Sequence, residues 1–141
     1  MNRLIPFLLL VVATGCAGTQ ALTVESGPED VIETMVEAYA ARDLDAMMAV
    51  FDPNIEWMSV EGDDITMVAT GRPPLRSMMA ENLAAYPDAS WRVESMHRVG
   101  AYVTTTEHAT WDGGQSSLRN AVVYEVRDGL VKRIWFFPPA E

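Results

Sequence analysis

The sequence predicts an α+β fold, in which three helices cover one face of a curved, mostly antiparallel sheet. Two patterns along the chain predict it. Between residues 28 and 86, apolar side chains recur in three stretches at the spacing of an amphipathic helix. From residue 90 onward, four runs alternate apolar and polar side chains and are separated by glycine-containing turns, as antiparallel strands are.

The three expected helices each have their own start and stop signals. The first begins at Pro28, with Ser26 or Gly27 as its cap and two acids in its first turn. Its apolar stripe consists of Val31, Ile32, Met35, Val36 and Tyr39. Asp43 caps a second helix over residues 44–51, which Pro53 and Asn54 terminate. A third helix spans residues 73–86 and ends before Pro87.

Six strands are expected, two of them before the third helix. The first two are a strand over residues 55–60 and, after an acidic turn, a strand over residues 65–70. The other four cover residues 90–99, 101–111, 117–127 and 130–137. The two faces of the last strand are about equally apolar, so its orientation is left open.

The N-terminal segment predicts export. A basic start at Arg3, an apolar run over residues 4–12 and small residues before Cys16 have the anatomy of a secretory signal peptide over residues 1–15. The run is about half the roughly 20 residues that span a bilayer. Residues 13–16 resemble the lipobox of bacterial lipoproteins, which implies an acylated Cys16 and a lipid-anchored protein of the cell envelope, on the periplasmic side or the cell surface. The alternative is ordinary cleavage that leaves a free thiol.

Composition limits the partners of the domain. Residues 16–27 are small and polar and read as a tether, so the folded domain covers residues 28–141. With 10 Lys plus Arg against 20 Asp plus Glu, the net charge is −10. Binding to nucleic acid or to an anionic membrane surface rests on clustered positive charge, so neither partner is expected. Contact with a membrane is expected through the lipid anchor only.

The run YAARDLDAMMAVFDPNIEW, residues 39–57, the later Gly-Arg-Pro and the closing hairpin VVYEVRDGLVKRIWFF carry a family resemblance. Together they resemble the nuclear transport factor 2-like superfamily, in its SnoaL-like and ketosteroid-isomerase-like branches. The resemblance covers residues 28–137 and implies a cone with a deep apolar pocket at its open end. The fold alone does not fix the function, because it hosts enzymes, binding modules and docking proteins.

The isomerase branch uses a Tyr in the first helix, an acidic base in the first long strand and a protonated Asp in a late strand. Aligned on the turn at residues 42–45, these positions hold Met35, Ser59 and a residue near Val122. The resemblance therefore does not carry isomerase activity by that mechanism over to this chain.

Strand alternation separates the adjacent Glu107 and His108, because neighbours in a strand point to opposite faces. The more apolar set contains Glu107 and Trp111, so Glu107 is expected to face the pocket and His108 to face away. Burial disfavours a charged carboxyl, which suits a general acid or base. Alternatively, Arg119 or Arg133 neutralises Glu107, or Thr105 and Tyr124 hydrogen-bond to it. The ligand-binding candidates are Tyr39, Trp57, Ser59, Trp111, Asn120 and Tyr124.

No metal site and no cofactor is expected. His97 and His108 lie eleven residues apart and lack zinc-binding spacing, and the only cysteine is Cys16. His97 is interpreted as a surface or dimer-face residue. The nine methionines fall at helix-core spacing and are expected to fill irregular gaps.

Three functional hypotheses follow. The first is binding of a small, largely apolar molecule without turnover. The second is an isomerase, cyclase or hydrolase that uses Glu107 as general acid or base. The third is an interaction module that forms a homodimer through the outer sheet face, which would include His108, Glu125 and Arg127.

Overall fold

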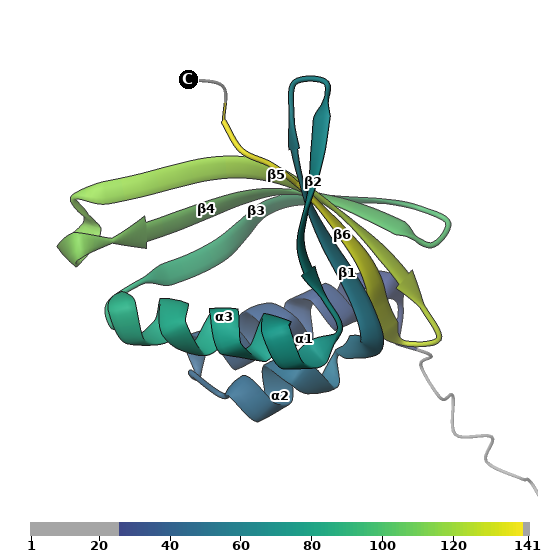
Figure 1. Ribbon diagram of the computed structural model, residues 1–141, viewed down its shortest axis with the longest axis horizontal. Coiled ribbons are helices and arrows are strands. Elements are labelled where there is room, and N and C mark those ends of the chain that lie inside the picture. The colour runs from purple at the N-terminus through teal and green to yellow at the C-terminus, as the bar shows by residue number, and fades with distance from the viewer. Residues whose placement is uncertain (1–25, 140–141) are drawn as a thin grey trace, which may run out of the picture.

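The computed structural model describes residues 26–139. This part of the chain forms the helices α1 (Pro28–Ala40), α2 (Leu44–Ala49) and α3 (Arg72–Ala85). Its strands are β1 (Phe51–Glu61), β2 (Asp64–Thr70), β3 (Ser90–Val99), β4 (Tyr102–Trp111), β5 (Ser116–Arg127) and β6 (Leu130–Phe137). The helices lie together on one side of a strongly bent sheet (Figure 1). The predicted α+β class is confirmed.

The strands form one sheet in the order β2-β1-β6-β5-β4-β3. Only β1 and β6 pair in parallel; the other neighbours are antiparallel. Irregularities interrupt the pairing of β1 with β2, of β3 with β4 and of β5 with β6. An extra residue in one strand bends it and increases its twist. The sheet can therefore curve around the helices, and the tip of the β1–β2 hairpin projects away from them (Figure 1).

The irregularity in β6 explains why alternation could not orient this strand. Val126 pairs with Val131, but the preceding Glu125 pairs with Arg133, so β6 contains one extra residue. Val131 and Ile134 are both buried although they lie three residues apart. A strict period of two is therefore broken inside the strand, and neither set of alternate residues forms a single face.

The predicted end of the second helix and the predicted start of the first strand are both wrong, because the strand was expected to begin at residue 55 and begins at Phe51. The second helix was expected to run to residue 51, but α2 ends at Ala49 and Phe51 is the first residue of β1. Phe51 pairs in parallel with Val131 of β6, and its carbonyl oxygen accepts a hydrogen bond of 2.7 Å from Nε of Arg72. Both partners are distant in sequence, so tertiary pairing overrides the local helical pattern.

The turn between α1 and α2 fixes the helices against the loop before β3. Asp43 caps α2 as predicted, because its carboxylate accepts a hydrogen bond of 2.9 Å from the backbone N–H of Ala46. Arg42 has a left-handed φ of 58°. Its guanidinium donates to the carbonyl oxygens of Pro87 and Ala89 and lies 5.3 Å from the ring centre of Tyr39. The turn thereby holds Tyr39 in position.

The outer sheet face carries an ion cluster in which a buried carboxylate is held by two exposed arginines. Glu125 is only 3% exposed, and its carboxylate accepts hydrogen bonds from Arg127 at 2.5 Å and from Arg133 at 2.7 Å. The hydrogen bond from Arg127, and then that from Arg133, lower the pKa of Glu125 despite its burial. Beside this cluster the rings of Tyr102 and Trp135 lie 6.3 Å apart.

No helix in residues 26–139 is long and apolar enough to cross a membrane. The predicted signal peptide over residues 1–15 and Cys16 lie outside the described residues.

Candidate functional site

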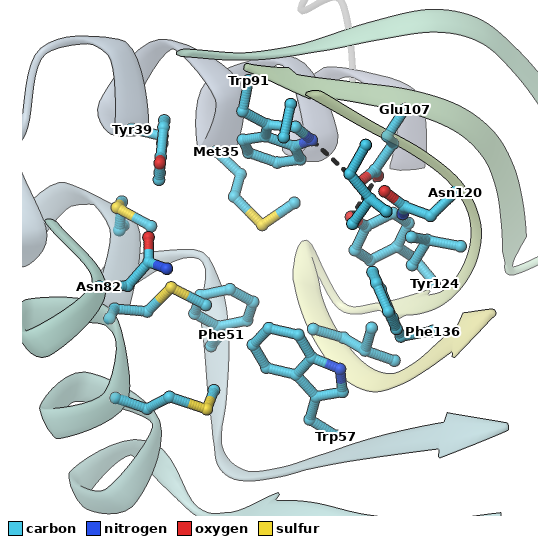
Figure 2. Close-up of a pocket in the computed structure, with 17 residues that line it drawn as sticks. Met35, Tyr39, Phe51, Trp57, Asn82, Trp91, Glu107, Asn120, Tyr124 and Phe136 are labelled. Atoms are coloured by element: carbon cyan, nitrogen blue, oxygen red, sulfur yellow. Dashed lines mark hydrogen bonds between the residues drawn. The ribbon is translucent and has the colours of Figure 1, made fainter. Parts of the chain in front are cut away.

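A cavity of about 290 Å³ lies between the helices and the inner face of the sheet. In Figure 2, side chains from the helices and from the sheet converge on this space. Most of its walls are apolar. The aromatic residues are Tyr39, Phe51, Trp57, Trp91, Tyr124 and Phe136, and the methionines are Met35, Met47, Met78 and Met79. The remaining polar lining residues are Asn82, Glu107 and Asn120.

Glu107 is the centre of the polar wall. It is 5% exposed, and its Oε1 accepts hydrogen bonds from Oγ1 of Thr105 at 2.7 Å and from the hydroxyl of Tyr124 at 2.6 Å. Its Oε2 accepts one from Nε1 of Trp91 at 2.9 Å, drawn as a dashed line in Figure 2. These three donors come from β3, β4 and β5, so the carboxylate ties the three strands together.

The donors to Glu107 are all uncharged. Burial, and then the neighbouring Glu107 carboxylate, raise the pKa of the Tyr124 hydroxyl well above its usual value near 10. Tyr124 therefore keeps its proton at physiological pH and donates it to the carboxylate. The sequence left open two alternatives to a catalytic Glu107, namely pairing with an arginine and hydrogen bonding to Thr105 and Tyr124. The geometry matches the second alternative, and Trp91 is a third donor.

The arginines suggested as partners of Glu107 bind elsewhere. Arg119 donates to Glu94 at 3.0 and 3.2 Å, and Arg133 donates to Glu56 and Glu125, each at 2.7 Å. None of the described residues that line the cavity is Lys, Arg or His. Glu107 is the only carboxylic acid in that lining.

Two buried nitrogen atoms of lining residues lack a partner. Within residues 26–139, neither Nε1 of Trp57 nor Nδ2 of Asn120 makes a hydrogen bond. Asn120 is 8% exposed and pairs directly with Glu107 across β4 and β5. A buried donor without an acceptor costs free energy, so a water molecule at either position would stabilise the protein.

Five of the seven predicted site residues meet in this cavity: Tyr39, Trp57, Glu107, Asn120 and Tyr124. The other two do not line it. The hydroxyl of Ser59 donates to Glu61 at 3.3 Å, and the ring of Trp111 packs edge-on against Tyr86 at 6.1 Å. Ser59 and Trp111 each follow a lining residue of the same strand, Trp57 and Ala109, by two residues. Alternation therefore identified the correct face of each strand, but it could not show how far along the strand the cavity extends. Ligand binding by the five stays a prediction.

The sequence interpretation missed Trp91 and the residues that α3 contributes. Trp91 pairs with Ala109, which belongs to the inward set of β4, so pairing the two strands in the right register would have placed it inside. The irregularity between Val93 and Ser95 breaks alternation in β3 and hides this signal. Met78, Met79 and Asn82 lie on the α3 face that closes the cavity.

The other predictions concern positions away from the cavity. His108 points outward, where its Nδ1 lies 3.7 Å from Oε1 of Glu94, and His97 is exposed. Across residues 26–139, no three His, Cys, Asp or Glu side chains gather in a way that would hold a metal ion. Of the three positions that correspond to isomerase residues, Met35 and Val122 line the cavity and Ser59 does not.

Comparison with known proteins identifies the family. The SnoaL-like domain matches residues 32–134 of the chain. The chain belongs to the SnoaL-like domain family. This match confirms the predicted nuclear transport factor 2-like superfamily, to which the described helices and curved sheet also conform. No curated protein matches this SnoaL-like chain significantly in sequence.

Solved structures share the fold of this SnoaL-like domain. A candidate ketosteroid isomerase from Kribbella flavida DSM 17836 has a TM-score of 0.67 at 21% identity, over 81% of this chain and 78% of that one. A nuclear transport factor 2-like protein of unknown function from Cytophaga hutchinsonii ATCC 33406 has a TM-score of 0.66 at 11% identity, over 84% and 95%. TerC, co-crystallised with polyporic acid, has a TM-score of 0.63 at 16% identity, over 79% and 91%. Identities this low show the fold alone.

Proposed function

We propose that this SnoaL-like domain binds a small, largely apolar molecule in its cavity without turning it over. The observation that carries the proposal is the lining itself, in which aromatic rings and thioethers surround one carboxylate that is already hydrogen-bonded three times. Enclosed apolar cavities with a few polar groups are typical of small-molecule sites. Methionine side chains adapt to ligands of different shape.

The hydrogen bonds of Glu107 favour binding over catalysis. Three donors already occupy its two oxygen atoms, which leaves little of the carboxylate free to exchange a proton with a substrate. The positions that the isomerase branch uses hold Met35, Ser59 and a residue near Val122. The alternative is an isomerase, cyclase or hydrolase that uses Glu107 as general acid or base. It is supported by the place of Glu107 in the cavity wall and by structural similarity to a candidate ketosteroid isomerase.

Blocking the cavity tests the binding proposal. Ala109 lines it from β4, so Ala109→Trp should fill it and weaken binding of the neutral probe N-phenyl-1-naphthylamine by about tenfold or more, as a lost apolar contact of about 1.4 kcal/mol would. Probe fluorescence measures the affinity. The matched control is Thr106→Trp on the exposed face of the same strand, which should bind like the natural domain. Unchanged binding by Ala109→Trp would place the probe outside this cavity.

Export and lipid anchoring remain proposals from the sequence. The lipobox-like residues 13–16 support an acylated Cys16 and a site in the cell envelope. Cys16→Ser should leave an unprocessed precursor without lipid, which mass spectrometry of the membrane fraction would detect. Normal acylation of that variant would contradict the lipoprotein reading.

Pairing of two chains is the third proposal. The outer sheet face carries Tyr102, Trp135 and the cluster of Glu125 with Arg127 and Arg133. Tyr, Trp and Arg are enriched at protein interfaces. A homodimer through this face would leave the cavities of both chains open to ligand. Sedimentation equilibrium of the domain without its lipid would test the pairing, and a monomer at high concentration would rule it out.

A further inference from the structure

We propose that the ligand is a lipophilic amine, whose ammonium group sits against Glu107 while its apolar body fills the rest of the cavity. This inference rests on the proposed binding function and names its ligand class. Two features of the cavity carry it: a buried carboxylate without a cationic partner, and the aromatic rings of the lining, of which Trp91 and Tyr124 donate hydrogen bonds to that carboxylate.

The charge of Glu107 lacks compensation inside the described domain. The carboxylate is 5% exposed, and its hydrogen bonds come from Thr105, Tyr124 and Trp91, none of which carries positive charge. No Lys, Arg or His in residues 26–139 forms an ion pair with it or lines the cavity. A buried charge without a counterion is destabilising. A cation supplied by the ligand would offset that cost.

The hydrogen bonding leaves room for such a cation. A carboxylate offers about four acceptor sites. Two donors occupy Oε1 and only one occupies Oε2, so one site on Oε2 stays open. Figure 2 shows the Asn120 amide beside this carboxylate, and the two residues are direct partners across β4 and β5. An ammonium group carries three donors, so it can bond to Oε2 and to the amide oxygen of Asn120 together.

Aromatic rings form the surroundings that an ammonium group needs. The indole of Trp91 reaches Glu107 directly. The ring of Tyr39 packs edge-on against Trp91 with 5.5 Å between ring centres, but the guanidinium of Arg42 already lies over it. Tyr124 and Trp57 line the same space. The faces of such rings attract cations, most strongly where water is excluded. The combination of a carboxylate and aromatic rings favours an amine over a neutral molecule of the same shape.

The charge of the whole molecule acts in the same direction. With a net charge of −10, the chain attracts cations to its surface and repels anions. Fatty acids and other apolar carboxylates are therefore expected to be poor ligands for two reasons. The negative charge of the protein surface repels them, and inside the cavity the Glu107 carboxylate, which has no cationic partner, repels their own carboxylate. Discrimination by charge is the distinctive consequence of the proposal.

Three probes that share one ring system test it. They are 2-naphthylmethylamine, which is cationic at neutral pH, 2-naphthylmethanol, which is neutral, and 2-naphthoate, which is anionic. Calorimetric titration of the domain should give the amine about tenfold higher affinity than the alcohol, as one ion pair with cation–π contact would provide. No binding of the naphthoate is expected. The preference for the amine should shrink as salt is added.

The outcomes separate this inference from the proposed function. Equal affinity for amine and alcohol would overturn the amine proposal and leave apolar binding intact, whereas absence of binding by all three would remove both. In Glu107→Gln the affinity for the amine should fall to within about twofold of the affinity for the alcohol, because the side chain loses its charge and keeps its size. The matched control is Glu81→Gln, which removes the same charge from an exposed site on α3 and should keep the preference. If Glu107→Gln does not fold, the three probes on the natural domain still decide.

Discussion

Phe51→Ala is expected to lower the free energy of unfolding by about 3–5 kcal/mol, the usual cost of truncating a fully buried Phe. Phe51 is 1% exposed and belongs at once to the core, to the cavity wall and to the first pairing of β1 with β6. The truncation would enlarge a cavity that already exists. The surroundings therefore cannot close over the lost ring, which places the expected cost toward the upper end of that range.

Urea denaturation followed by tryptophan fluorescence would measure the change in Phe51→Ala. The matched control is Phe137→Ala at the end of β6, where the ring is 37% exposed. This substitution should cost less than about 1 kcal/mol, because surface side chains contribute little to stability. A similar loss in both variants would mean that Phe51 is not the anchor of the β1–β6 pairing that the structure indicates.

The helices and the succession of strands along the chain were predictable because they rest on local signals. The cap at Asp43 and the apolar stripe of the first helix depend on residues within one or two turns of each other, and both match the structure. The end of α2 was not predictable. Phe51 leaves the helix because it pairs with Val131, eighty residues later in the chain, and no local pattern carries that contact.

The limits of site prediction were set by breaks in alternation. The strands β4 and β5 pair without an irregularity, and there period two placed Glu107, Asn120 and Tyr124 on the inner face. In β3 and β6 an irregularity shifts the pattern, so Trp91 was missed and the last strand could not be oriented. The donor that completes the hydrogen bonding of Glu107 comes from one of these irregular strands.

Glu107→Ala is expected to lower the free energy of unfolding by about 3 kcal/mol or more, because it leaves several buried donors unpaired at roughly 1–3 kcal/mol each. The hydroxyls of Thr105 and Tyr124 and Nε1 of Trp91 would all lose their acceptor. Glu107→Gln should cost less, about 1–2 kcal/mol, because its amide oxygen can still accept from Thr105 and Tyr124. Thermal and urea denaturation would rank the three proteins.

This ranking distinguishes a structural carboxylate from a catalytic one. Catalytic groups are often held in strained or unfavourable surroundings, so their removal tends to leave stability unchanged or to raise it. A carboxylate that joins β3, β4 and β5 should do the opposite, and its loss should be coupled to Tyr124. In a double-mutant cycle, Tyr124→Phe should cost clearly less in the Glu107→Ala background than alone, because the hydrogen bond is already gone. Additive effects, or a more stable Glu107→Ala domain, would contradict the structural role and favour the enzymatic alternative.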